Sequence, residues 1–225
     1  NSKNIDLMLP VVVVGHVDHG KSTLLGRLLF ETGCLPEGKV DSIKKMINRR
    51  STDFEWSYVM DAFKAEREQG ITIDTTQIQL RTSERDYLLI DAPGHEEFLK
   101  NMITGAANAT AALLVIDVAE GVRDQTQRHA YLLKLLGVQE VVVIVNKMDL
   151  VDYAQNSFLD VSKQILSYLD ELGINTQVII PVVARDGDNL LIHSQIMSWY
   201  EGPTVVEALN SLPAPPLLID KPLRL

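Results

Sequence analysis

One run near the N-terminus has the residue types and spacing of a phosphate-binding loop. Residues Gly15–Ser22 read GHVDHGKS, which fits G-x-x-x-x-G-K-[ST] between an apolar run and a helix-like segment. The glycines let the loop fold back, so that backbone N–H groups and the helix N-terminus face the α- and β-phosphates. We expect Lys21 to reach the β- and γ-phosphates and Ser22 to ligate Mg²⁺. The predicted phosphate-site residues are His16, Val17, Asp18, His19, Gly20, Lys21, Ser22 and Thr23.

Two further runs carry groups suited to the γ-phosphate end of the same ligand. DAPGH begins at Asp91, whose carboxylate can hold a water in the Mg²⁺ shell, and Gly94 can offer an unobstructed N–H to the γ-phosphate. GITID contains Thr72, whose hydroxyl could ligate Mg²⁺ and whose N–H could touch the γ-phosphate. Such contacts exist only with a triphosphate bound, so this segment is expected to act as a switch. The predicted metal ligands are Ser22, Thr72 and Asp91, and Lys21 and Thr72 are candidate catalytic residues.

A fourth run predicts which base is bound. Residues Asn146–Asp149 read NKMD and follow an apolar run. The carboxylate of Asp149 can accept hydrogen bonds from guanine N1–H and the 2-amino group. Adenine has no such pair of donors at that edge and would leave the carboxylate unpaired. Lys147 is expected to lie over the base. These features favour GTP and GDP over adenine nucleotides.

The elements that must position these runs alternate between strands and helices. Short apolar runs predict strands at Leu9–Val14, Ile71–Leu80, Tyr87–Ile90, Ala112–Ile116, Val141–Val145 and Val178–Val183. Three- and four-residue apolar spacing predicts helices at Lys21–Glu31, Gln125–Leu136 and Phe158–Leu172. This alternation indicates an α/β fold: a doubly wound, mostly parallel six-stranded sheet that binds its ligand at the carboxyl ends of the strands. The second run alternates apolar and polar residues, as in an edge strand.

Two segments interrupt the alternation. A long charged insert covers Thr32–Gly70, and Pro213–Pro216 reads PAPP, a proline-rich linker. We therefore expect a nucleotide-binding domain over residues 1–212. Residues 213–225 are expected to be a linker and the start of a second domain.

Composition limits the remaining possibilities. The 225 residues are 46% hydrophobic and 23% charged, with a formal net charge of −9, which is typical of a globular protein and unfavourable for direct binding to DNA. The single cysteine, Cys34, cannot form an internal disulfide, and no apolar run approaches the roughly 20 residues that span a membrane. A cytoplasmic location without membrane contact is expected. His129 and His193 lack a ligand-spaced partner and are expected on the surface or behind the site.

Together these motifs resemble the GTPase domain of translation factors, including elongation factor Tu, over nearly the whole chain. The runs Glu66–Asp74 and Asn101–Gly105 are similar to the branch that holds elongation factor 1-alpha and the GTPase subunit of sulfate adenylyltransferase. The resemblance implies a GTP/GDP switch with Mg²⁺, in which His95 places the attacking water. It also implies that Asp18 helps to hold a monovalent cation near the phosphates. In place of the family's usual Ser-Ala pair at guanine O6, the sequence has Val183, Ala184 and Arg185, of which Ala184 and Arg185 are the predicted guanine-loop residues.

The resemblance leaves two biological systems open. An elongation factor would deliver aminoacyl-tRNA to the ribosome through further domains, and the N-terminal motifs favour this function. A sulfate-activating GTPase would instead act on the catalytic subunit of sulfate adenylyltransferase, which NKMDLVDY at Asn146–Tyr153 favours. A scaffold that binds GTP without hydrolysis is disfavoured by the intact candidate catalytic residues, and an ATPase by Asp149.

Overall fold

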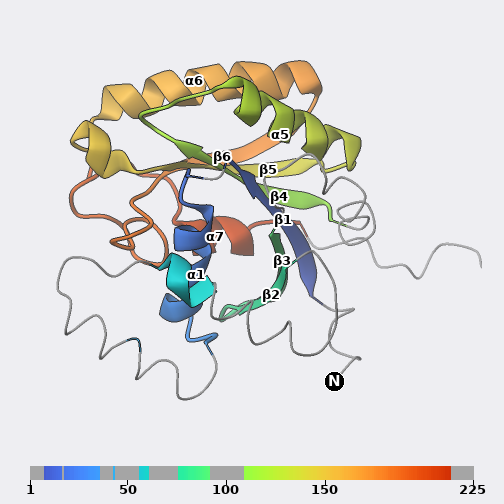
Figure 1. The fold of residues 1–225 in the computed structure, drawn as a ribbon, viewed down its shortest axis with the longest axis vertical. Helices are drawn as coiled ribbons and strands as arrows, with labels where there is room; N and C mark the ends of the chain where they lie inside the picture. Colours follow the sequence, from blue (N-terminus) through green and yellow to red (C-terminus); the bar gives the residue numbers. More distant parts are fainter. Residues whose placement is uncertain are drawn as a thin grey trace, which may run out of the picture.

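Six strands form one mixed sheet in the computed structural model, which describes residues 8–16, 18–35, 43, 56–60, 76–91 and 109–213. The strands are β1 (Leu9–Gly15), β2 (Thr76–Arg81), β3 (Asp86–Asp91), β4 (Ala111–Asp117), β5 (Glu140–Asn146) and β6 (Asn175–Pro181). Their order across the sheet is β2-β3-β1-β4-β5-β6 (Figure 1). All neighbours pair in parallel except β2 and β3, which form an antiparallel hairpin. The predicted doubly wound, mostly parallel α/β sheet is confirmed.

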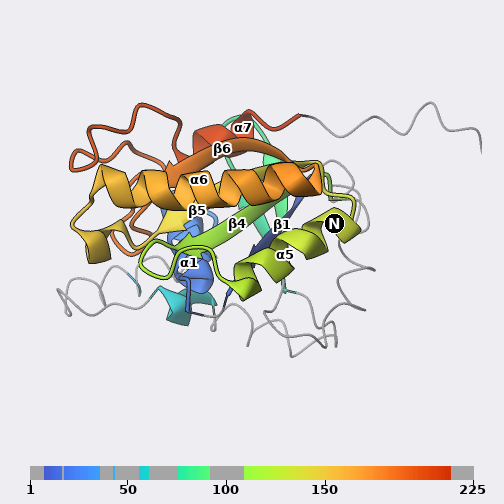
Figure 2. The ribbon, with the colours of Figure 1, turned by 90° about the horizontal axis from the view of Figure 1, so that it is seen from above.

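Helices cover both faces of this sheet. The helices α5 (Asp124–Leu135) and α6 (Gln155–Leu172) lie on one face, while α1 (Lys21–Glu31) and α7 (Val205–Asn210) lie on the other (Figures 1 and 2). Strand β1 feeds both layers, because Val11 and Val13 pack in the α1 core and Val12 and Val14 in the α5/α6 core. Burial on both faces explains why β1, β4 and β5 are nearly continuous Val, Ile, Leu and Ala.

The two outer strands depart from the sequence prediction at their ends. In β2, Ile78 and Leu80 are buried and Gln79 is exposed, as expected of an edge strand with one wet face. It begins at Thr76, and residues 71–75 of the predicted run lie outside the described residues. Strand β6 occupies Asn175–Pro181, so the predicted Val178–Val183 was wrong at both ends. An edge strand pairs through its backbone, which lets the polar Asn175 and Thr176 join despite the register shift at Val141/Val142.

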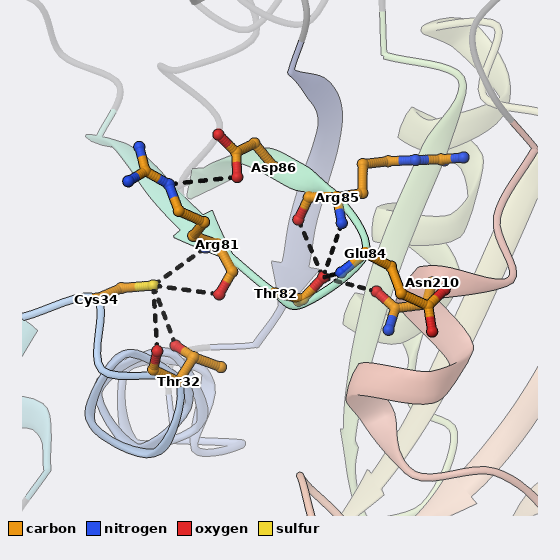
Figure 3. Close-up of polar contacts among 8 residues, drawn as sticks. All are labelled: Thr32, Cys34, Arg81, Thr82, Glu84, Arg85, Asp86 and Asn210. Atoms are coloured by element: carbon orange, nitrogen blue, oxygen red, sulfur yellow. Dashed lines mark hydrogen bonds and ion pairs between the residues drawn. The ribbon is translucent and has the colours of Figure 1, made fainter.

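Polar contacts fix the β2–β3 hairpin against its neighbours (Figure 3). The Thr82 hydroxyl donates to Asn210 of α7 at 2.9 Å, and the Tyr87 hydroxyl donates to the same amide oxygen at 2.9 Å. On the α1 side, the Arg81 N–H donates to the Cys34 sulfur at 3.1 Å, and the thiol donates to the Arg81 carbonyl at 3.4 Å. Cys34 therefore joins the end of α1 to the edge strand.

A glycine inside α1 supplies a test of the packing between this helix and Trp56. A Cβ at Gly26 would overlap the Trp56 carbonyl oxygen, and it would lie 3.4 Å from the Val59 Cβ. Alanine inside a helix normally adds roughly 0.5–1 kcal/mol of stability over glycine. We expect Gly26→Ala to lower the free energy of unfolding by about 1–3 kcal/mol instead, because the backbone at Trp56 must move. Urea unfolding measures this, and a stability gain of the helix-propensity size would contradict the close packing.

Among the described residues, none of the helices has the length and apolar character needed to cross a membrane.

Candidate functional site

Most of the predicted site residues that the structure describes lie at or next to the ends of strands, at one edge of the sheet. Strands β1, β3, β4 and β5 run parallel and end at Gly15, Asp91, Asp117 and Asn146. Parallel strands that cross over through helices bring their carboxyl ends to the same edge, where α/β sheets bind ligands. Motifs that are far apart in the sequence therefore lie close together in the structure.

The loop between β1 and α1 needs glycine where it meets the helix. Gly20 precedes the first residue of α1 with φ of 85°, in the left-handed region. A Cβ at this position would also collide with the Asn146 side chain. Both the positive φ and the lack of space for a Cβ require glycine at this position. The closeness of the Asn146 side chain shows that the start of α1 lies beside the end of β5.

Two histidines of the loop, His16 and His19, lie side by side, and His19 contacts two neighbouring segments of the chain. His19 is 1% exposed, with Nδ1 3.3 Å from the Val115 carbonyl oxygen and Nε2 3.2 Å from a Glu120 carboxylate oxygen. The ring of His16 meets it edge-on at a centroid distance of 5.3 Å. His19 thus connects the loop to β4 and the loop that follows β4.

His129 of α5 is buried, at 7% exposure, whereas His193 is exposed and contacts Glu207 at 3.4 Å. Burial, followed by the positive charge of Lys21 and the neighbouring His16 and His19, lowers the pKa of His129 to about 4. His129 is therefore uncharged at neutral pH.

Lys21, predicted to be catalytic, and Asp91, predicted to ligate a metal ion, lie together in the structure. Lys21 Nζ lies 2.9 Å from Asp91 Oδ1, with side-chain exposures of 10% and 6%. Ser22 follows in the first turn of α1. A hydroxyl and a carboxylate are ligands of the kind that Mg²⁺ prefers, so the described part of the predicted metal site fits that ion.

Asn146 joins the phosphate loop to the guanine loop. Its Nδ2 donates to the His19 carbonyl at 2.9 Å, and its Oδ1 accepts from the Ala184 N–H at 3.0 Å. The Asn146 side chain is buried, so each hydrogen bond is protected from water. One amide therefore fixes the distance between the parts of the site that would face phosphates and base.

Lys147 depends on a residue that the sequence analysis did not single out. Its Nζ lies 2.8 Å from Asp117 Oδ2, and Asp117 is buried at the end of β4. The other carboxylate oxygen accepts from the Ala119 N–H at 2.8 Å. The sequence does contain a signal for Asp117: like Asp91, it is an acidic residue at the end of a run of buried apolar residues.

The predicted base-recognition carboxylate faces a pocket of about 360 Å³. Its lining comes from the phosphate loop, the NKMD run, the guanine loop and the segment around Trp56: Gly20, Thr23, Trp56, Ser57, Asn146, Lys147, Asp149, Leu150, Val183, Ala184 and Arg185. In this structure the Arg185 guanidinium contacts Asp149 at 3.4 Å and also binds Asp186.

Two residues outside the motifs hold the guanine loop. Arg27 of α1 and the Trp56 indole N–H each donate to the Arg185 carbonyl oxygen at 3.0 Å. The Arg27 guanidinium also lies 4.8 Å from the centre of the Trp56 ring and binds Glu31 at 2.7 Å. Neither residue belongs to a recognisable motif, so only the structure reveals this role.

Some predicted site residues cannot be placed. Val17, Thr72, Gly94 and His95 lie outside the described residues. Within the described part of the chain, no group of three or more His, Cys, Asp or Glu side chains could hold a metal ion. Asp18 is described and exposed.

The fold and the strand-end motifs define a P-loop nucleotide-binding domain. Residues 7–213 match the family model of the elongation factor Tu GTP binding domain, and the chain belongs to this family. It is 47% identical over 215 residues to elongation factor 1-alpha of Thermococcus onnurineus (strain NA1), a match that covers 96% of the chain and 50% of the relative. Elongation factor 1-alpha of Pyrococcus furiosus is 46% identical over the same extent. The chain thus spans about half the length of these relatives.

Solved structures give the same result. The structure of the GTPase-like domain of S. cerevisiae Ski7, bound to GDP and inorganic phosphate, is similar with a TM-score of 0.68 and 25% identity. The match covers 91% of this chain and 49% of the Ski7 domain chain. Sup35 complexed with GMPPNP has a TM-score of 0.65 and 26% identity, covering 93% and 46%. The predicted membership of the elongation-factor class of GTP-binding domains is confirmed.

Proposed function

We propose that this chain is the switch domain of an elongation-factor-like translation GTPase, hydrolysing GTP to GDP and phosphate with Mg²⁺. The observation that carries the proposal is the Asn146 bridge, which sets the phosphate loop and guanine loop around a pocket that Asp149 faces. The relatives named above are elongation factors, which favours translation over the sulfate-activation alternative.

The chain's own residues divide the work of binding and catalysis. Lys21 would exchange its contact with Asp91 for the β- and γ-phosphates, and Asp149 would accept from the guanine edge, with Lys147 against the base. Asp117 keeps the Lys147 side chain in place. Ser22 and Asp91, with Thr72, would hold Mg²⁺, which supplies charge neutralisation at the phosphates. Gly94 would bind the γ-phosphate, His95 would orient the attacking water, and Asp18 would help to hold a monovalent cation.

The partners follow from the same proposal. Aminoacyl-tRNA and the ribosome are the expected partners, reached through parts of the protein beyond this domain, in the cytoplasm. The net charge of −9 fits a domain that does not itself provide the main RNA-binding surface.

Nucleotide titration tests the function directly. With Mg²⁺ present, calorimetry is expected to show saturable binding of GDP and GTP and at least 100-fold weaker binding of ADP and ATP. An adenine base would leave the Asp149 carboxylate without its two donors, and because an unpaired charged group costs more than a neutral one, the expected cost is about 3 kcal/mol or more. Similar affinities for GTP and ATP would overturn the role given to Asp149.

A further inference from the structure

Arg185 occupies the polar edge of the base pocket. Its Nε and Nη2 each bind one oxygen of Asp186 at 3.0 Å, while Nη2 also lies 3.4 Å from Asp149 Oδ2. One guanidinium is therefore shared between two carboxylates. One of these, Asp149, is the group proposed to recognise guanine, and its side chain is 21% exposed.

The backbone of Arg185 is fixed while its side chain is free to reorient. The carbonyl oxygen of Arg185 accepts from both Arg27 and Trp56 at 3.0 Å, which holds the main chain at this point. The Arg185 side chain is 58% exposed, so other orientations are available to it without disturbing the core. Such a residue can leave Asp149 without any movement of the loop.

The chemistry of the contact indicates its role. The Watson–Crick edge of guanine offers an N1–H and a 2-amino group, and a guanidinium offers the same arrangement of N–H donors to a carboxylate. Asp149 Oδ2, one of the two oxygens that would accept from the base, is the atom that Arg185 Nη2 contacts at 3.4 Å.

We propose that Arg185 competes with the guanine edge for Asp149: its guanidinium contacts the carboxylate that would accept from the base, and it must be displaced before the base can pair. This inference rests on the proposed function. Its consequence is that Arg185 weakens nucleotide binding and accelerates nucleotide release.

Asp186 determines how strongly Arg185 competes with the base for Asp149. Because Asp186 binds the guanidinium through two hydrogen bonds, it draws Arg185 away from Asp149 and gives it a partner after displacement. Removing the Asp186 charge leaves Asp149 as the remaining carboxylate in contact with Arg185 among the described contacts. Arg185 and Asp186 variants are therefore expected to change nucleotide affinity in opposite directions.

The expected changes in nucleotide affinity have the opposite direction to those expected from charge alone. A nucleotide is an anion, so loss of a nearby arginine would weaken its binding and loss of a nearby aspartate would strengthen it. Displacement of Arg185 by the base predicts the reverse in both cases. The direction of the change is therefore sufficient to decide between the two accounts.

The experiment uses the purified chain and a GDP analogue that carries a fluorophore on the ribose. Release is followed by displacement with excess GDP, and affinity by calorimetry with unlabelled GDP. Arg185→Ala is expected to bind GDP about two- to fivefold more tightly and to release it correspondingly more slowly, as loss of an exposed ion pair with Asp149 implies. Asp186→Asn is expected to bind GDP more weakly and release it faster. The double variant is expected to match Arg185→Ala, because Asp186 acts through Arg185.

Arg81→Ala is the matched control. Arg81 is another exposed arginine paired with an aspartate, at 3.3 Å from Asp86, but it lies on the β2–β3 hairpin rather than in the base pocket (Figure 3). It is expected to leave GDP binding and release unchanged. Weaker GDP binding by Arg185→Ala, or tighter binding by Asp186→Asn, would overturn the inference alone. A wild-type chain that bound no GDP would overturn the proposed function, and the inference with it.

Discussion

Asp149→Asn is expected to exchange the base preference of the domain from guanine to xanthine. The carboxylate accepts twice, whereas an asparagine amide accepts at one atom and donates at the other. Its NH₂ group would oppose the 2-amino group of guanine but would pair with the 2-oxo group of xanthine. Loss of a charge-assisted pair and the unpaired donors together cost about 2–3 kcal/mol, so GDP affinity is expected to fall roughly 30- to 150-fold. Calorimetry with GDP and xanthosine diphosphate measures both changes.

Asp186→Asn provides the control for this exchange. Asp186 is adjacent to Arg185 and binds it, but it does not line the base pocket. Its replacement is expected to change GDP affinity without any gain in xanthosine diphosphate binding. An Asp149→Asn variant that keeps full GDP affinity would show that another group reads the base.

The sequence was sufficient to predict the sheet because its strands are buried on both faces. Continuous apolar runs at β1, β4 and β5 leave little choice of element, and β1 and β5 each carry a motif at the carboxyl end. The bounds of β6 were wrong because an edge strand needs apolar residues on fewer positions, and Asn175 and Thr176 pair through the backbone alone. Periodicity is therefore least informative at the sheet edges.

The predicted site residues lie together in the structure where a motif supplies both the side chain and its position. Lys21 meets Asp91, and Asn146 reaches Ala184, although 70 and 38 residues respectively separate the partners. Arg27 and Trp56 escaped prediction because their roles depend on tertiary contacts. Asp117 carries a strand-end signal in the sequence, but its partner does not follow from that signal. Asp117 needs Lys147 in a left-handed turn with φ of 64°, which no local pattern of apolar residues encodes.

The loop predicted to contact guanine is held by contacts that involve no serine. The position that usually holds serine in this family is Val183, which is buried. Here the loop is held by Asn146 at the Ala184 N–H and by Arg27 and Trp56 at the Arg185 carbonyl. These three contacts come from β5, α1 and the insert, so the loop is fixed from both sides without the serine hydroxyl.

His95→Ala is expected to separate hydrolysis from nucleotide binding. Positioning and charge stabilisation are most of what a protein contributes to phosphoryl transfer, so loss of the residue that orients the water is expected to slow single-turnover GTP hydrolysis by roughly 10²-fold or more. GDP affinity is expected to stay nearly unchanged, because His95 belongs to the γ-phosphate side of the proposed site. Quenched-flow measurement of phosphate release from a preformed GTP complex, beside calorimetry with GDP, gives both quantities.

His193→Ala is the appropriate control for this loss. His193 is exposed and paired with Glu207 at 3.4 Å, in the segment before α7, and its replacement is expected to leave the hydrolysis rate unchanged. Hydrolysis at the full rate in His95→Ala would remove the catalytic role from His95. The binding roles proposed for Lys21, Asn146 and Asp149 would stand, because they rest on contacts and a pocket among the described residues. A parallel loss of GDP affinity would instead place His95 in the binding site and contradict its assignment to the γ-phosphate side.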